Sequence, residues 1–357
     1  MPRPTLARVD LAALRYNYRL ACQRTGSGQA MAVVKADGYG HGLAAVATAL
    51  RDDAPCFAVA CLEEALTIRQ AGLTQPVVLL EGVHAPADLA VCAAQGFEPV
   101  LHHGQQVQWA MASRERPLVW LKLNTGMNRL GFPPAELPAL MSQLTPAGFR
   151  VRGLMTHFAC ADDLESGFTV TQTRVFETAA AEFPELLLSA ANSAAHFRPG
   201  QPLFDWSRPG IMLYGATPML DATGMELGLK PVMSLESELI SVRTLEPGMS
   251  VGYGARWVAD KPTLMGVVAI GYGDGYPRHA GTGTPAAVKG IRVRLIGRVS
   301  MDMLAVDLSP VPDARPGDSV ELWGSQVSVD EVADAAGTIG YELLTGVTPR
   351  VPRQYSE

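Results

Sequence analysis

Short apolar runs that alternate with helix-patterned stretches constrain the fold of the first 215 residues most strongly. Seven such runs lie at residues 30–36, 56–62, 76–82, 97–102, 118–124, 151–158 and 186–192, and an eighth lies within 203–215. Segments with helical spacing separate them, among them 42–53, 63–72, 104–115 and 169–183. Apolar strands that alternate with helices are typical of a parallel sheet buried on both faces. Eight units close a barrel, so we expect an α/β fold that begins with a TIM-like (β/α)8 barrel.

The pattern changes after about residue 228. Strand-like runs such as LESELISVRTL and LMGVVAIGYG follow one another between turn-forming residues, and only VDEVADAAG has helical spacing. We therefore expect a barrel domain at residues 1–228 and a mostly β domain at residues 229–357. An open doubly wound sheet is the alternative for the first domain, but no G-x-G-x-x-G motif opens a helix after the first strand.

Composition and charge narrow the class of protein. Hydrophobic residues make up 48% of the 357, and the net charge is −6 without a long basic run, which argues against nucleic acid or an anionic membrane as partner. No apolar segment is long enough to span a bilayer, and the first residues lack a signal-peptide pattern. The five cysteines have neither disulfide nor zinc spacing, and we expect His102 and His103 at the surface, with no metal. These features favour a cytoplasmic protein.

Reactive side chains stand at the carboxyl ends of the expected strands, where functional groups of (β/α)8 barrels lie. Lys35, Lys122, His157 and Asn192 each lie at or near the end of an apolar run. The eighth run offers two choices, LFDWSR and GIMLYG. We favour the first, because it brings Arg208 to the same face of the barrel.

Lys35 is the side chain with the most informative surroundings, VVKADGYGHG. Most lysines at a strand end only extend their ammonium group into solvent. Here Gly38, Gly40 and Gly42 allow the backbone to approach a ligand closely, and Tyr39 supplies a hydroxyl. We therefore expect a ligand site in which Lys35 is a phosphate counter-ion, a Schiff-base nucleophile or a proton base.

Nine motifs, in order, resemble those of the alanine racemases, a family of pyridoxal-phosphate enzymes. They are VVKADGYGHG, KLNTGMNRLGF, THFACAD, ANSAA, RPGIMLYG, VGYGARW, IGYGDGYPR, GRVSMDM and YELLTGVTPRVPR. Together they span more than three hundred residues and both expected domains. The resemblance implies an isomerase that interconverts L-alanine and D-alanine, either supplying D-alanine for peptidoglycan or channelling alanine catabolism. It also implies pyridoxal 5'-phosphate as cofactor.

The resemblance further implies a two-base mechanism on a pyridoxal-phosphate aldimine. Racemisation takes the Cα proton from one face and returns one to the other, so one base on each face is the simplest solution. By the resemblance, Lys35 holds the cofactor as an internal aldimine and serves one face, and Tyr253 serves the other. His157 and Arg208 match the residues that the family places behind this tyrosine. An arginine beside the ring nitrogen cannot accept a proton, which favours proton exchange over decarboxylation.

Further positions of the family have matches in this sequence. By the resemblance, the cofactor and its phosphate are bound by Tyr39, Asn192, Ser193, Gly210, Ile211 and Tyr341. Arg129 would contact the cofactor and the substrate carboxylate, and Lys122 would be carbamylated so that its negative charge orients Arg129. Tyr272, Met301 and Asp302 would contribute to substrate binding and, like Tyr253, would reach the active site from the partner subunit of a homodimer.

Three alternatives stay open at this point. A related pyridoxal-phosphate barrel decarboxylase would need a carboxylate in place of Arg208 and a catalytic cysteine in the β domain, whereas all five cysteines precede residue 161. A barrel that only carries the cofactor would lack everything after about residue 230, including Tyr253. A racemase of broader specificity would differ only in the substrate side chains that its pocket accepts. Serine could be accepted beside alanine, because a pocket excludes one additional hydroxyl only weakly.

Overall fold

A parallel barrel forms the first part of the chain in the computed structural model, which describes residues 3–357. Seven parallel strands follow one another in chain order: β3 (Ala32–Val33), β4 (Phe57–Val59), β5 (Val77–Leu79), β6 (Phe97–Leu101), β7 (Val119–Lys122), β8 (Val151–Met155) and β9 (Leu187–Ser189). The eighth, β10 (Trp206–Ser207), pairs in parallel with β2 (Gln29–Ala30), which leads into β3. On its other side, the Arg208 amide donates to the Ala191 carbonyl at 2.8 Å, just beyond β9. The predicted barrel is confirmed, and its eighth strand is the run that ends at Arg208.

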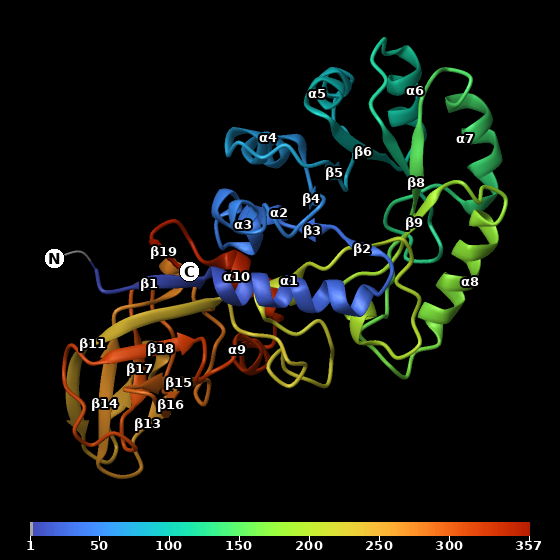
Figure 1. Ribbon diagram of the computed structural model, residues 1–357. Helices are drawn as coiled ribbons and strands as arrows, with labels where there is room; N and C mark the ends of the chain where they lie inside the picture. Colours follow the sequence, from blue (N-terminus) through green and yellow to red (C-terminus); the bar gives the residue numbers. More distant parts are fainter. Residues whose placement is uncertain (1–2) are drawn as a thin grey trace.

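Helices surround the strands of the barrel (Figure 1). They are α1 (Leu11–Thr25), α3 (Leu43–Ala49), α4 (Leu62–Gln70), α5 (Asp88–Gln95), α6 (Gly104–Ala112), α7 (Leu137–Leu144) and α8 (Phe168–Ala180). The strands are short and their side chains are fully buried, as at Val77, Val78 and Leu79. This burial on both faces explains why the strands read as continuous apolar runs. The predicted helices at 42–53, 63–72, 104–115 and 169–183 are confirmed as α3, α4, α6 and α8.

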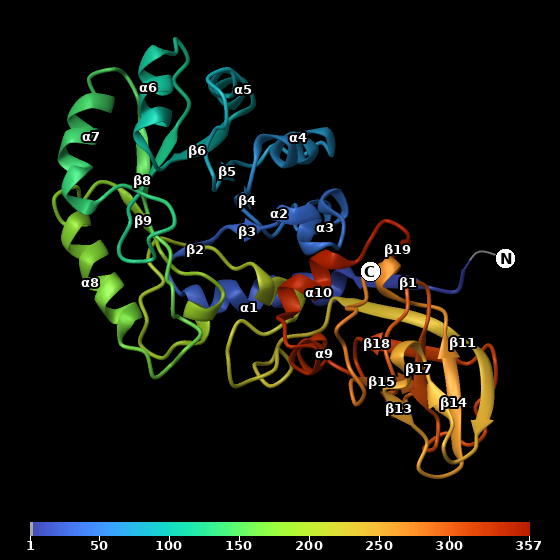
Figure 2. The same cartoon turned by 180° about the vertical axis from the view of Figure 1, so that it is seen from behind.

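An eight-stranded sheet forms the second part of the molecule, beside the barrel (Figure 2). Its order is β14 (Thr263–Val268), β17 (Leu304–Asp307), β16 (Ile291–Leu295), β15 (Pro285–Val288), β18 (Ser319–Trp323), β11 (Met233–Leu245), β1 (Leu6–Asp10) and β19 (Arg353–Ser356). A small hairpin of β12 (Ser250–Val251) and β13 (Trp257–Val258) forms a separate two-stranded sheet. All pairs are antiparallel except β1 with β19. The predicted mostly β second part is therefore confirmed.

The first strand of the chain belongs to this second sheet. Residues of β1 pair with β11 on one side and with β19 on the other, for example Ala7 with Leu235 and with Arg353. The chain then enters the barrel at α1, whose N-terminus is capped by Asp10 through a 2.8 Å bond from the Ala13 amide. The chain thus passes directly from β1 in the β sheet to α1 in the barrel.

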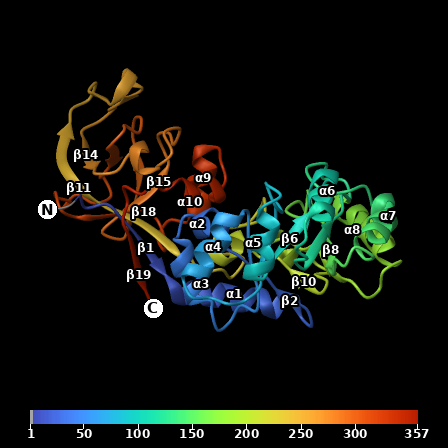
Figure 3. The ribbon, with the colours of Figure 1, turned by 90° about the horizontal axis from the view of Figure 1, so that it is seen from above.

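Two short helices lie between the barrel and the sheet, as Figures 1 and 3 show. The first, α9 (Val329–Ala336), is the predicted helical segment, and Ser328 and Glu331 form a capping box at its N-terminus. The second, α10 (Gly340–Gly346), was not predicted, because its seven residues are too few to show a clear helical period. Within residues 3–357, no helix combines the length and the apolarity needed to cross a membrane.

Candidate active site

A cavity of about 700 Å³ opens at the carboxyl ends of the barrel strands. It is lined by the predicted site residues Lys35, Tyr39, Lys122, Arg129, His157, Asn192, Ser193, Arg208, Gly210, Ile211 and Tyr341. All but Tyr341 come from the barrel, and Tyr341 comes from α10. The barrel brings these side chains together because parallel strands end at the same face.

Lys35 leads into a turn of unusual backbone conformation, α2 (Lys35–Tyr39). Ala36, Asp37, Gly38 and Tyr39 have φ angles of 52°, 53°, 61° and 53°, so the chain makes a left-handed turn directly after the lysine. Residues with a Cβ atom rarely adopt this conformation, because Cβ then crowds the following carbonyl. The turn points the Tyr39 side chain toward the same cavity that Lys35 lines.

The amines of Lys35 and Lys122 lie in a region of positive charge. Burial lowers the pKa of Lys35, and the charges of Arg129 and Arg208 lower it further, whereas the Glu81 carboxylate opposes them. Burial and the charges of Arg208 and Arg129 also lower the pKa of Lys122 to about 8. Near neutral pH a lowered pKa increases the neutral fraction of an amine, which is the form that acts as base or nucleophile.

Arg208 is buried behind the cavity and held by four acceptors. Its Nη1 donates to Ser189 Oγ at 2.6 Å, and its Nη2 donates to the carbonyls of Thr156 and Ala190 at 2.5 and 3.2 Å and to His157 Nδ1 at 3.2 Å. Among residues 3–357, none accepts from the third nitrogen, Nε. Burial lowers the pKa of Arg208 to about 9. This fixed guanidinium, with one donor left free, can bind a single acceptor atom of a ligand in the cavity.

A second group of donors gathers around Ser193 and Gly210. The amides of Gly210 and Met212 donate to Ser193 Oγ at 2.8 and 3.4 Å. A Cβ atom added to Gly210 would lie 2.4 Å from the Tyr39 hydroxyl oxygen, so only glycine leaves this space. The Tyr39 ring stacks on Tyr214 with centroids 4.6 Å apart. The two amides leave the O–H of Ser193 free to donate, so the hydroxyls of Tyr39 and Ser193 at this end of the cavity suit an anionic oxygen-rich group such as a phosphate.

The predicted residues of the β part lie outside this cavity. Tyr253 and Met301 are exposed over 69% and 53% of their surface, Tyr272 is exposed over 38%, and Asp302 is also exposed. None of them lines the cavity of the same chain. The structure therefore divides the predicted site residues into a set that lines the barrel mouth and a set on the surface of the β part.

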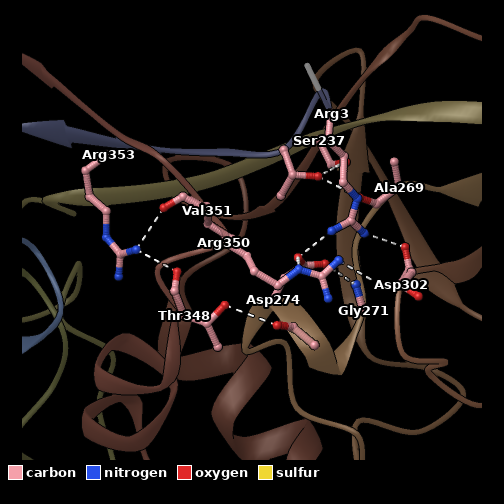
Figure 4. A network of polar contacts seen from close by, with 12 residues as sticks. Arg3, Ser237, Ala269, Gly271, Asp274, Asp302, Thr348, Arg350, Val351 and Arg353 are labelled. Atoms are coloured by element: carbon pink, nitrogen blue, oxygen red, sulfur yellow. Dashed lines mark hydrogen bonds and ion pairs between the residues drawn. The ribbon is translucent and has the colours of Figure 1, made fainter. Parts of the chain in front are cut away.

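Three ion pairs hold the loops that carry Tyr272, Met301 and Asp302 (Figure 4). Asp274 is fully buried, pairs with Arg3 and Arg350, and accepts from the Gly271 amide at 3.0 Å. Arg350 also donates to Asp302 Oδ1 at 2.8 Å. A buried carboxylate with several donors fixes its surroundings, so these loops hold Tyr272 and Met301 in defined positions.

Comparison with known proteins identifies the family. The family model for the alanine racemase N-terminal domain matches residues 9–218, and that for the C-terminal domain matches residues 232–355. An alanine racemase from Marinobacter nauticus is 64% identical over 355 residues, which are 99% of each chain. The chain belongs to the alanine racemase family.

Solved structures of alanine racemases share the fold of this chain. The biosynthetic alanine racemase from Pseudomonas aeruginosa is 50% identical, with a TM-score of 0.96 over 99% of this chain and 100% of the other. The alanine racemase from Bartonella henselae, solved with covalently bound pyridoxal phosphate, is 29% identical, with a TM-score of 0.90 over 99% of this chain and 100% of the other.

The cavity fits the cofactor of the alanine racemase family. The free Nε donor of Arg208 suits an acceptor nitrogen, the donors around Ser193 and Gly210 suit a phosphate, and the Lys35 amine suits an aldehyde. These groups would hold the two ends of the cofactor and its reactive carbon. Pyridoxal phosphate therefore matches the donor set of this chain.

Three residues around the cavity were not predicted as site residues from the sequence. Glu64 and Arg353 hydrogen-bond the backbone around the Lys35 turn, and Glu81 lines the cavity. Arg353 lies within the motif YELLTGVTPRVPR, but no sequence signal distinguishes Glu64 or Glu81 from solvated carboxylates. The expected surface position of His102 is wrong: its ring is buried, and Nε2 lies 2.9 Å from the Glu81 carbonyl.

Proposed function

We propose that this chain interconverts L-alanine and D-alanine with pyridoxal 5'-phosphate as cofactor, as an isomerase of the alanine racemase family. The observation that supports this most directly is the buried Arg208 guanidinium, which offers a donor to the cavity and cannot accept a proton in return. A partner of this kind leaves a pyridine nitrogen unprotonated, which favours proton exchange at Cα over loss of the carboxylate.

The proposed chemistry at Cα is a transfer of protons between two faces. When bound, pyridoxal phosphate supplies a conjugated ring that makes the Cα proton of an amino acid more acidic. The Lys35 amine, with its lowered pKa, holds and moves the proton on one face of Cα. Arg129, which lines the same cavity, binds the substrate carboxylate and so fixes the orientation of Cα.

The base for the second face is proposed to be the partner subunit's Tyr253. Within one chain, Tyr253 is exposed and does not line the cavity. A homodimer with shared active sites would bring it to the barrel mouth of the other subunit, together with Tyr272, Met301 and Asp302. The loop of the exposed Tyr272 is bonded to that of the exposed Met301, because the Gly273 amide donates to the Met301 carbonyl at 2.8 Å, and the two side chains give the β part an apolar surface suited to burial in an interface.

Charge complementarity supports the same arrangement. A Cβ atom added to Gly254, the residue after Tyr253, would lie 3.8 Å from the side chains of Arg256 and Arg298. Desolvation and the charges of Arg256 and Arg278 lower the pKa of Arg298, which agrees with a basic surface there. Beside the active-site cavity, a groove of about 710 Å³ is lined by acidic side chains, including Asp162 and Asp334. A basic surface on one subunit can therefore approach an acidic groove on the other.

Lys122 is proposed to be carbamylated. It is only 8% exposed, and it lies among the positive charges of Arg208, Arg129 and Lys35. A neutral amine reacts with carbon dioxide, and the product is an anion that would offset these charges and orient Arg129. The pKa near 8 leaves part of the amine neutral at physiological pH.

The remaining proposals concern the organisation and the setting of the protein. We propose a division into residues 1–228 and residues 229–357, with β1 inserted into the second sheet. A cytoplasmic location, with D-alanine supplied for peptidoglycan or with alanine catabolism, is consistent with five free cysteines.

A chiral assay of the purified protein tests the proposal. L-alanine should be converted to a mixture of both enantiomers, and D-alanine likewise, without release of carbon dioxide. Lys35→Ala and Tyr253→Phe should each abolish most of the activity, and borohydride treatment should attach the cofactor to Lys35. Attachment elsewhere, or release of carbon dioxide as the main reaction, would contradict the proposal.

A further inference from the structure

We propose that Glu64 and Arg353 are positioning residues for Lys35, because they hold the left-handed turn that follows it. Glu64 belongs to α4, and Arg353 belongs to β19 at the other end of the chain. Neither lines the active-site cavity. The inference rests on the proposed role of Lys35 and adds the two residues that keep its backbone in place.

The turn needs support from outside its own sequence. Three of its residues, Ala36, Asp37 and Tyr39, carry a Cβ atom and still have φ between 52° and 53°. Such backbone persists only where the surrounding structure determines it, and it is often found next to functional groups. Asp37 supplies part of the support itself, because its Oδ1 accepts from the Leu43 amide at 2.8 Å.

Glu64 supports the start of the turn. Its Oε1 accepts from the Ala36 amide at 2.6 Å, and its Oε2 accepts from the Ala60 amide at 2.8 Å. Ala36 directly follows Lys35, and Ala60 directly follows β4, the strand next to β3. One carboxylate thus joins the ends of two neighbouring barrel strands. A glutamine could accept only one of these bonds and would turn an NH2 group toward the other amide.

Arg353 supports the end of the turn. Its Nε and Nη2 both donate to the Gly40 carbonyl at 3.1 Å. The other bonds of its guanidinium go to the carbonyls of Val347, Thr348 and Val351 at 2.6 to 2.8 Å. The planar guanidinium therefore joins the turn to the last residues of the chain, which a lysine ammonium could not do with the same geometry.

The contact between the turn and the end of the chain is close. A Cβ atom added to Gly40 would lie 2.2 Å from the Leu344 carbonyl oxygen, and one added to Gly42 would lie 2.2 Å from the Tyr355 hydroxyl. Leu344 belongs to α10, the helix that also carries Tyr341. Arg353 therefore holds the turn that carries Lys35 and Tyr39 against α10, which carries Tyr341. The distance between these two sides of the cavity is thereby kept constant.

The test compares matched variants of the full chain as purified. Glu64→Gln is paired with Glu63→Gln, because Glu63 is the exposed neighbour on the same helix. Arg353→Lys is paired with Arg8→Lys, because Arg8 is exposed on the strand next to β19. Glu64→Asp keeps two carboxylate oxygens, so its hydrogen exchange and kcat should lie between those of Glu64→Gln and the unmodified chain. Thermal unfolding is measured first, so that all comparisons are made well below each midpoint.

Hydrogen exchange at the turn is the decisive measurement. We expect the amides of residues 36–42 to exchange about tenfold faster in Glu64→Gln and Arg353→Lys than in their controls, as the loss of charge-assisted bonds predicts. We also expect kcat for alanine to fall about tenfold with little change in KM, and less cofactor to be fixed on Lys35 by borohydride. Unchanged exchange at residues 36–42 in both variants would overturn the proposal.

The same experiment separates this inference from the proposed function. If the unmodified chain does not racemise alanine but the exchange effect is present, the proposed function fails and the support of the turn stands. If the unmodified chain racemises alanine and both variants match their controls in exchange and in kcat, the positioning role fails alone. Lower thermal stability with unchanged exchange at the turn also contradicts the positioning role.

Discussion

Arg208 donates a hydrogen bond from Nη2 to Nδ1 of His157 across 3.2 Å. This direction requires a neutral imidazole, because a protonated one has no acceptor. Burial and the charges of Arg208 and Lys122 lower the pKa of His157 well below its usual range, which agrees with the direction of the bond. The pair therefore consists of a fixed cation and a neutral acceptor.

We predict that His157 stays neutral from about pH 5.5 to 8, where a free histidine would gain or lose its proton. The sign follows from the lowered pKa: protonation would begin only at more acidic pH. Nitrogen-15 NMR of labelled protein measures this, with His157→Asn used to assign the signal. A change of the His157 resonances within this pH range would contradict the prediction.

Arg208→Lys should reduce activity strongly and destabilise the fold. A lysine cannot serve the four acceptors that Arg208 serves, so a buried charge would lose most of its partners. We expect a loss of about 3 kcal/mol in the free energy of unfolding and about a hundredfold in kcat/KM. Urea unfolding and racemisation assays measure the two effects. Arg243→Lys, at an exposed position, is the control and should change either quantity little.

Carbamylation of Lys122 should increase with pH around the pKa of the amine. Since that pKa is lowered to about 8, the neutral form is a minority at pH 7 and the majority at pH 9. Carbon-13 NMR with labelled bicarbonate should detect a carbamate that is absent from Lys122→Arg. Lys289 is the internal control, because its bond to Asp313 raises its pKa and it should stay unmodified. Equal labelling of both lysines would contradict the prediction.

Subunits with complementary defects should restore activity when mixed. Lys35→Ala removes the proposed base in the barrel, and Tyr253→Phe removes the proposed second base on the β part. After the two variants are unfolded and refolded together, one of the two sites in each hybrid dimer has both groups. We expect about a quarter of the unmodified activity if subunits pair at random. Activity no higher than that of the separate variants would show that Tyr253 does not act across subunits.

Gly210→Ala should weaken phosphate binding. The added Cβ atom would lie 2.4 Å from the Tyr39 hydroxyl oxygen and would displace it from the cavity. We expect affinity for the cofactor and for inorganic phosphate to fall about tenfold, the effect of one charge-assisted bond. Gly167→Ala is the matched control, because an added Cβ there meets no atom within 4 Å. Calorimetry measures the affinities of both variants for the cofactor and for phosphate. Equal affinities in Gly210→Ala and Gly167→Ala would contradict the role of Gly210.

The barrel, and the predicted site residues that line its cavity, could be predicted because both follow from local sequence patterns. Buried parallel strands are apolar throughout, and their ends share one face, so Lys35, Lys122, His157 and Arg208 could be expected in one cavity. The family's motifs added Tyr341 from α10, which no strand pattern indicates.

The remaining features depend on contacts between distant residues. Ala36 has no preference for left-handed backbone and Asp37 adopts it only occasionally, whereas Glu64 and Arg353, which hydrogen-bond this turn, are distant in the sequence. The pairing of β1 with β19 likewise joins residues from the two ends of the chain. Hydrophobic periodicity predicts that such strands exist, but it contains no information about which strands become neighbours.

The pairing of β1 with β19 has a consequence for synthesis on the ribosome. The sheet that holds the chain's first strand is complete only when its last strand, Arg353–Ser356, has left the exit tunnel. Until then β1 has one edge without its final neighbour, even though the barrel that follows it has already been translated. A nascent chain that stalls before its last residues would expose this edge, and we expect it to become a substrate for chaperones or proteases rather than a working enzyme.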